Sequence, residues 1–93
     1  MREPLNGGQV ERLESLTGQL LTLREVMAKA GYRSYNAALR RAQKGRIPGG
    51  FMLDTHWRFK ADRVEAWLQH WWDPADEPWE DFVNRNGIAE YLL

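Results

Sequence analysis

Cysteine is absent from the sequence, which excludes disulfide bonds and thiolate metal sites. The first residues contain no apolar run of signal-peptide length, and no segment approaches the roughly 20 apolar residues that a membrane-spanning helix needs. A chain of 93 residues is also too short for a second, separate substrate domain. From these absences we expect a cytoplasmic protein with no membrane association.

Residues that could carry catalysis are equally sparse. The two histidines, His56 and His70, fall in different predicted elements without a nearby carboxylate set, so we expect no metal site. The densest group of carboxylates is Asp76, Glu77, Glu80 and Asp81. Prolines precede and interrupt this group, a setting that favours solvation over paired acid–base chemistry. The Pro-Gly-Gly at residues 48–50 lacks the lysine and the strand–loop–helix setting of a phosphate-binding loop. We expect neither an enzyme nor a cofactor.

Acidic residues are scarce in the middle of the chain. Residues 24–60 contain nine cations and only two anions, a net charge of +7, whereas residues 61–93 carry −6. The first 23 residues carry −1, so the whole chain is neutral. A chain polarised in this way is expected to present a basic face to an anionic partner and to direct its acidic end elsewhere. A solvated basic surface without a ligand is the alternative.

Two short helices are predicted in the first third of the chain. An apolar pattern at helical spacing predicts the first over residues 10–16. The second begins at a capping box, in which the Thr22 hydroxyl accepts from the N–H of Glu25 and the Glu25 carboxylate accepts from the N–H of Thr22. It is expected to end at Gly31, a residue suited to the left-handed position after a helix.

The next helix is predicted from Ser34, an N-cap residue, to Gly45. Its apolar face consists of Tyr35, Ala38, Leu39 and Ala42, and the opposite face consists of Asn36, Ala37, Arg40 and Lys44, with Arg41 at the edge. Two short helices joined by a tight turn are typical of a helix-turn-helix. The alternative is an ordinary amphipathic helix whose arginines are solvated.

The polar face of this helix has the side chains that read base edges. Asn36 can pair with adenine N6 and N7, Arg40 can pair with guanine O6 and N7, and the small Ala37 allows close approach to the groove floor. The face contains no acidic residue. The predicted DNA contacts of this helix and its start are Arg33, Ser34, Asn36, Ala37, Arg40, Arg41 and Lys44.

A β-hairpin is predicted over residues 51–59, with its turn at Asp54-Thr55. Trp57 and Phe59 fall on one face of the second strand and pack beneath it. A basic-tipped hairpin beside a recognition helix is a wing, which can reach the DNA backbone or the minor groove. The predicted wing contacts are Arg46, Thr55, His56, Arg58 and Lys60. The alternative is a hairpin that only completes the core.

A further helix is predicted after the hairpin. Asp62 and Glu65 form a second candidate capping box at its start. The apolar residues Val64, Trp67, Leu68 and Trp71 follow helical spacing, and we expect this stripe to face the core.

An acidic, aromatic tail occupies residues 73–93. It opens as a linker, and Pro78 can start a short helix that closes at Asn86-Gly87. We expect its apolar residues to fold back on Trp71 and Trp72. The alternatives are self-association and docking on a recombinase, for which the candidate partner-binding residues are Trp72, Trp79, Phe82 and Val83.

The order of these segments resembles a known family. "LTLREVMAKAGY", "SYNAALRRAQKGRIPGG" and "HWRFKADRVEAWL" are similar to the small winged-helix DNA-binding domains of the phage excisionase group, related to the DNA-binding headpiece of MerR-type regulators. The residues at the pattern positions are Leu21, Thr22, Glu25, Gly31, Gly45, Ile47, Pro48, Trp57, Arg58, Val64, Trp67 and Leu68. The resemblance covers about residues 20–69 and departs from the pattern in two places. The segment between Gly31 and Gly45 is about one residue longer than in the family, and Met27 stands where the family has alanine.

The resemblance implies a mainly α fold with a small β-hairpin, a winged helix-turn-helix. This domain would occupy residues 20–72, between an N-terminal segment of residues 1–19 and the C-terminal tail. The implied function is sequence-specific binding of double-stranded DNA in the cytoplasm of a bacterial or phage-infected cell. The second helix would enter the major groove and the wing would contact the adjacent backbone or minor groove.

Within this family the resemblance favours an excisionase, which binds cooperatively and bends DNA beside a tyrosine or serine integrase, with self-association on the DNA. The same domain also serves prophage or plasmid transcriptional regulators and terminase small subunits. A protein-interaction adaptor that uses the aromatic tail is the alternative of another class.

Overall fold

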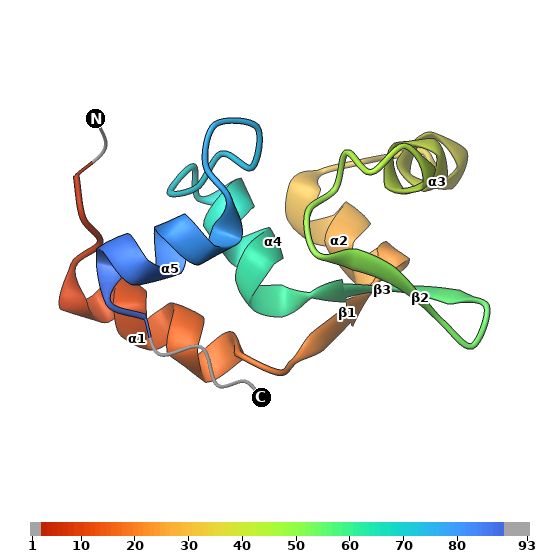
Figure 1. The fold of residues 1–93 in the computed structure, drawn as a ribbon. Coiled ribbons are helices and arrows are strands. Elements are labelled where there is room, and N and C mark those ends of the chain that lie inside the picture. Colours follow the sequence, from red (N-terminus) through yellow and green to blue (C-terminus); the bar gives the residue numbers. More distant parts are fainter. Residues whose placement is uncertain (1–2, 89–93) are drawn as a thin grey trace.

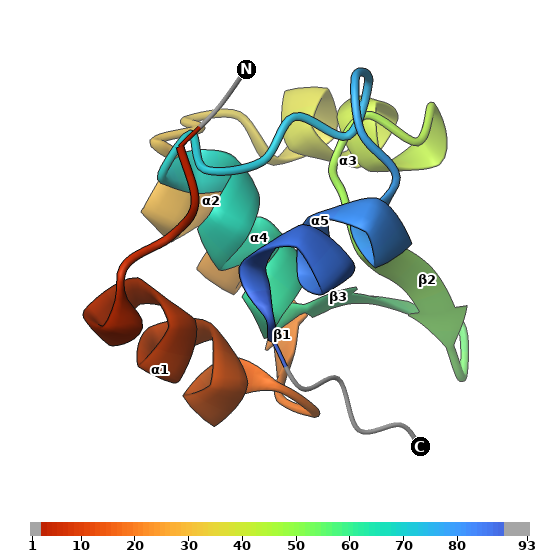
Figure 2. The ribbon, with the colours of Figure 1, turned by 60° about the vertical axis from the view of Figure 1, so that its left-hand side comes forward.

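The computed structural model describes residues 3–88, which contain five helices and a three-stranded antiparallel sheet (Figure 1). The helices are α1 (Gly7–Leu16), α2 (Leu23–Ala30), α3 (Tyr35–Gln43), α4 (Ala61–Leu68) and α5 (Trp79–Asn86). The strands are β1 (Leu20–Thr22), β2 (Gly50–Leu53) and β3 (His56–Lys60). Helix α4 lies between two groups of elements, with α1 and α5 on one side and α2, α3 and the sheet on the other (Figure 1). In Figure 2, which is turned by 60°, α5 lies in front of α4 and α1 lies at the lower left.

The sheet has the strand order β1-β3-β2. The expectation of a mainly α fold with only a hairpin is therefore incomplete, because β1 adds a third strand that pairs Thr22 with Arg58. Three residues are too few for a periodic apolar pattern, so the sequence carried no signal for β1. The predicted two-residue turn is confirmed, with Leu53 opposite His56. Asp54 and Thr55 both adopt positive φ, at 50° and 68°, as a two-residue turn of the hairpin type requires.

Helix α1 begins earlier than residue 10. Asn6 is its N-cap, and Asn6 and Gln9 form a capping box in which each side chain accepts from the other's backbone N–H at 2.9 Å. The Asn-Gly-Gly segment at residues 6–8 therefore supplies the cap and the first residues of the helix.

The predicted ends of α2 and the start of α3 are confirmed. Thr22 Oγ1 accepts from the N–H of Glu25 at 3.1 Å, and Glu25 Oε1 accepts from the N–H of Thr22 at 2.8 Å. Gly31 has a φ of 77° at the C-terminus of α2. Ser34 Oγ accepts from the N–H of Ala37 at 3.2 Å, which caps α3. These caps satisfy backbone groups that helix ends leave unpaired.

The predicted capping box at Asp62 and Glu65 is wrong. Strand β3 runs directly into α4, so the N-cap is Lys60, which makes no side-chain capping bond, and Asp62 is already inside the helix. Asp62 is instead buried and accepts from the N–H of Arg63 at 2.8 Å and from Arg63 Nη1 at 3.2 Å. An ion pair satisfies the carboxylate that burial would otherwise penalise.

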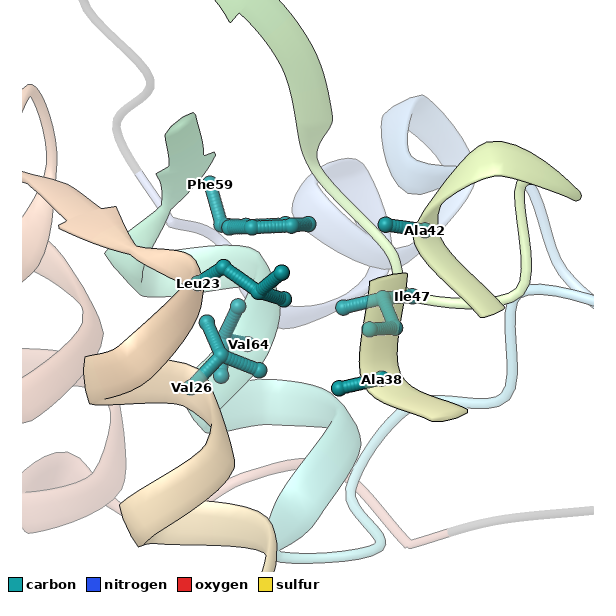
Figure 3. Close-up of a cluster of buried hydrophobic side chains, with 7 residues drawn as sticks. All are labelled: Leu23, Val26, Ala38, Ala42, Ile47, Phe59 and Val64. Carbon is teal, nitrogen blue, oxygen red and sulfur yellow. The ribbon is translucent and has the colours of Figure 1, made fainter. Parts of the chain in front are cut away.

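The first hydrophobic cluster joins α2, α3, α4 and β3. Its buried members are Leu23, Val26, Ala38, Ala42, Ile47, Phe59 and Val64 (Figure 3). Helix α3 contributes only alanines to this buried set, so its backbone packs close to its neighbours (Figure 3). Because the packed stripe of α3 is narrow, most of its remaining surface stays outside the core.

The second hydrophobic cluster joins α1, α4 and α5. Its buried members are Leu13, Ala66, Trp72, Phe82, Val83 and Ile88. Trp72 and Trp79 meet edge to face, with ring centroids 4.8 Å apart. The tail thus folds back as expected, and α5 starts after Pro78 and closes at Gly87 as predicted. The tail residues beyond Ile88 lie outside the described residues.

The segment between α4 and α5 is anchored to the second cluster at Glu77. Trp72 Nε1 donates to the Glu77 carbonyl at 2.8 Å. Arg85 donates to both carboxylate oxygens of Glu77, through Nε at 2.9 Å and Nη2 at 3.0 Å. This bidentate pair raises the pKa of Arg85. The acidic segment that read as a linker is therefore tied to α5.

Candidate nucleic-acid interface

Helix α3 presents a polar and cationic surface on the side away from the first cluster. Ala38 and Ala42 are buried and Leu39 is half-buried. All seven predicted contacts of α3 and its start are exposed: Arg33, Ser34, Asn36, Ala37, Arg40, Arg41 and Lys44. The sequence has no acidic residue between Glu25 and Asp54, so no carboxylate lies on this helix to oppose an anion.

Tyr35 departs from the predicted pattern. The sequence placed it on the apolar face of α3, but 41% of its surface is exposed. It is the first residue of the helix, beyond the reach of the alanine stripe, and its ring stacks under the Arg24 guanidinium at 4.9 Å. Tyr35 therefore belongs to the polar surface.

The hairpin residues divide into two groups. Thr55 and His56 are exposed at the turn, and Arg58 is half-buried and donates from Nη1 to the Trp57 carbonyl at 2.8 Å. Lys60 instead lines a hollow of about 540 Å³ with Gly49, Gly50, Phe51, Arg63, Trp72 and Trp79. Lys60 thus faces α5, and the structure does not bring it to the hollow that His56 and Arg58 line. Arg46 is exposed in the loop after α3.

A smaller hollow brings the helix pair and the hairpin together. It has a volume of about 160 Å³ and is lined by Thr22, Leu23, Arg24, Tyr35, His56, Trp57 and Arg58. These residues come from the start of α2, the start of α3 and the first half of β3. We call it the junction hollow. The predicted contacts His56 and Arg58 therefore lie beside the end of α3 that carries Asn36.

Arg24 and Tyr35 also belong to this surface, although neither was among the predicted contacts. The signal for Arg24 was present, because the capping box makes it the second residue of α2 and leaves its side chain free of the capping bonds. Its proximity to β3 depends on the pairing of β1 with β3, which no local pattern revealed.

Glu25 is an acidic side chain that interacts electrostatically with Arg58 of this surface. The hydrogen bonds from the Thr22 N–H and the Thr22 hydroxyl lower the pKa of Glu25 below its ordinary value of 4.5, and Lys29 and Arg58 lower it further. Its carboxylate is therefore ionised at neutral pH and occupied by the cap of α2. It does not line the junction hollow.

The candidate partner-binding residues lie mostly inside the second cluster. Trp72, Phe82 and Val83 are buried and Trp79 is half-buried, with Arg63 over its ring at 4.4 Å. The partner role remains a prediction, and for the three buried side chains it would require the cluster to open.

Neither a metal-holding group nor a membrane-spanning helix is found among the described residues 3–88. No group of three or more histidine or carboxylate side chains in this part of the chain is arranged to hold a metal ion. None of its helices combines the length and the apolar character needed to cross a membrane. A polar hollow of about 640 Å³ between α1, α2 and α4 contains the Arg12–Glu65 ion pair.

Comparisons with models of protein families, with curated proteins and with solved structures found no match to this chain.

Proposed function

We propose that this protein binds double-stranded DNA sequence-specifically as a winged helix-turn-helix, with α3 as recognition helix and the β2–β3 hairpin as wing. The observation that carries the proposal is the exposed face of α3, which holds Asn36, Arg40, Arg41 and Lys44 without an acidic residue. The junction hollow brings Arg58 and His56 of the hairpin beside the start of the same helix. A surface of this composition suits the phosphate backbone and the base edges of duplex DNA.

The roles of the α3 residues follow from their chemistry. Asn36 lies in the first turn, where a recognition helix contacts bases, and its amide can pair with an adenine. Arg40 lies one turn further along the same face and has the donors for a guanine. Lys44, at the C-terminus, is a point charge suited to a phosphate.

The most specific role that we propose is that of an excisionase, which binds in cooperative arrays and bends DNA beside an integrase. It rests on the resemblance of residues 20–69 to that group. A prophage regulator, a terminase small subunit or a protein-interaction adaptor would use the same fold differently. Selection of bound duplexes from a random library separates an excisionase, a symmetric regulator and an adaptor. Closely spaced direct repeats support cooperative assembly, an inverted repeat supports a symmetric regulator, and no enriched motif supports the adaptor.

Two substitutions on α3 test the proposed division between base and phosphate contacts. Arg40→Ala is expected to weaken binding to the selected site by about 1–3 kcal/mol and to relax the base preference at one position. Lys44→Ala is expected to weaken all sequences alike and to reduce the salt slope by about 1. The measurement is fluorescence anisotropy on selected and scrambled duplexes over a salt series.

Arg12→Ala is the matched control, because Arg12 is exposed on α1 and pairs with Glu65 outside the proposed interface. It should leave duplex affinity unchanged. If Arg40→Ala and Lys44→Ala had the same effect on every sequence, the assignment of the recognition face would be wrong. Wild-type protein without any salt-dependent affinity for duplex would refute DNA binding itself.

A further inference from the structure

The junction hollow is lined by two cationic side chains from different elements, Arg24 and Arg58. Arg24 enters from α2, and His56 and Arg58 enter from β3. No acidic side chain lines it. The two guanidinium groups offer planar N–H forks that match the oxygens of a phosphate, and Tyr35 lines the hollow beside them.

The two arginines are already positioned before any ligand binds. The Arg24 guanidinium lies 4.9 Å from the Tyr35 ring centroid, and Arg58 Nη1 donates to the Trp57 carbonyl at 2.8 Å. A guanidinium carries five N–H donors, so this single bond leaves donors for a ligand. Positioned side chains lose less conformational entropy on binding than solvated ones.

Backbone pairing between β1 and β3 fixes the distance between the two sides of the hollow, the start of α2 and strand β3. Thr22 caps α2, pairs with Arg58 across β1 and β3, and lines the hollow itself. The volume of about 160 Å³ accommodates several non-hydrogen atoms, because a water occupies about 30 Å³ in the liquid. Tyr35 places the hollow directly beside Asn36, at the N-terminal end of α3.

From this arrangement we propose that the junction hollow is the seat of one DNA backbone phosphate, held jointly by Arg24 and Arg58 with Tyr35 and His56 beside it. The proposal rests on the proposed function and deepens it. One phosphate shared by helix α2 and the wing fixes how far α3 enters the groove, so the seat sets the register of base reading.

A shared phosphate predicts non-additive salt dependence. Each neutralised phosphate contributes about 0.9 to the slope of log affinity against log salt. Arg24→Ala combined with Arg58→Gln should therefore lower the slope by about 0.9 in total, whereas two independent phosphates would give about twice that change. Glutamine keeps part of the half-buried Arg58 stem, which limits disturbance of the sheet.

Neutral phosphates locate the seat on the DNA. A methylphosphonate placed at each position of the selected duplex should weaken wild-type binding roughly 10-fold at one position beside the base read by Asn36. The variant that combines Arg24→Ala with Arg58→Gln should abolish sensitivity at that position and leave every other position as in the wild type. Arg12→Ala should keep the full wild-type pattern.

Three results would overturn the seat while leaving DNA binding intact. The first is an unchanged methylphosphonate pattern in the double variant, and the second is a slope change in the double variant near twice the change of about 0.9 that one phosphate gives. The third is that inorganic phosphate displaces duplex from the wild-type protein although no single methylphosphonate weakens duplex binding. Absence of duplex binding in the wild type would instead refute the proposed function.

Discussion

At the scale of single residues, Gly50 shows how closely β2 packs against a core side chain of its partner strand β3. A Cβ at this position would lie 2.8 Å from Cε2 and 3.1 Å from Cδ2 of Phe59, which is fully buried in the first cluster. Gly50→Ala therefore forces either the ring or β2 to shift, and we expect a loss of about 1–3 kcal/mol in unfolding free energy. Urea denaturation measures this loss as a lower midpoint.

Gly7→Ala is the matched control. Gly7 is the first residue of α1, and an added Cβ there meets nothing within 4 Å. Alanine also has the better helix propensity, so stability should be unchanged or slightly higher. A Gly50→Ala variant as stable as Gly7→Ala would show that the hairpin is not constrained by Phe59.

At the scale of elements, the start of α2 couples stability to pH. The pKa of Glu25 is lowered in the folded state, chiefly by the Thr22 N–H, so its contribution is present above the ordinary value of 4.5 and is lost as pH falls through the lowered value. We expect Glu25→Gln to keep the cap but to remove this part of the acid sensitivity. Unfolding free energies measured between neutral pH and pH 3 test this.

Thr22→Ala tests the other half of the same cap. It removes the acceptor for the Glu25 N–H and should lower the free energy of unfolding by about 1 kcal/mol at neutral pH.

Glu11→Gln, at an exposed position on α1, serves as the control for Glu25→Gln, because it also removes one carboxylate. If Glu25→Gln and Glu11→Gln had the same stability profile against pH, the cap would not be the source of the coupling.

The elements also show what the sequence can predict and what it cannot. The caps at Thr22 and Ser34 and the glycine stop at Gly31 were predictable, because each depends on side chains within a few residues. Strand β1 was not, because its partner β3 lies far along the chain. The Asp62 box failed for a related reason: where β3 ends decides where α4 begins, and that boundary is set by pairing.

The candidate site was predictable to a similar degree. The exposed face of α3 followed from helical periodicity, since all seven residues assigned to it are exposed. Arg24, Tyr35 and the separation of Lys60 from His56 followed only from the packing of β3 against α2 and α3, because tertiary contacts decide them.

At the scale of the whole molecule, α4 joins two hydrophobic clusters. Val64 is buried in the first, Ala66 is buried in the second, and Trp67 packs against both. We therefore expect one cooperative unfolding transition, in which tryptophan fluorescence and far-UV circular dichroism change together. Phe82→Leu should lower the free energy of unfolding by about 1–3 kcal/mol, because Phe82 is fully buried. Both signals should report the same loss.

Met52→Ala provides the comparison for that measurement, since 53% of Met52 is exposed. Its effect should stay within about 0.5 kcal/mol. Two separate transitions in Phe82→Leu, with the second cluster melting first, would contradict the shared role of α4.

The pairing of β1 with β3 has a consequence for the thermodynamics of association. The hairpin cannot rotate relative to α2 without breaking the pairs from Leu20–Lys60 to Thr22–Arg58. Its orientation is therefore established when the chain folds, and no ordering of this segment remains for the encounter with a ligand. The heat-capacity change on binding should then equal the value expected from the apolar area buried between two rigid bodies. The additional negative contribution that accompanies folding upon binding should be absent.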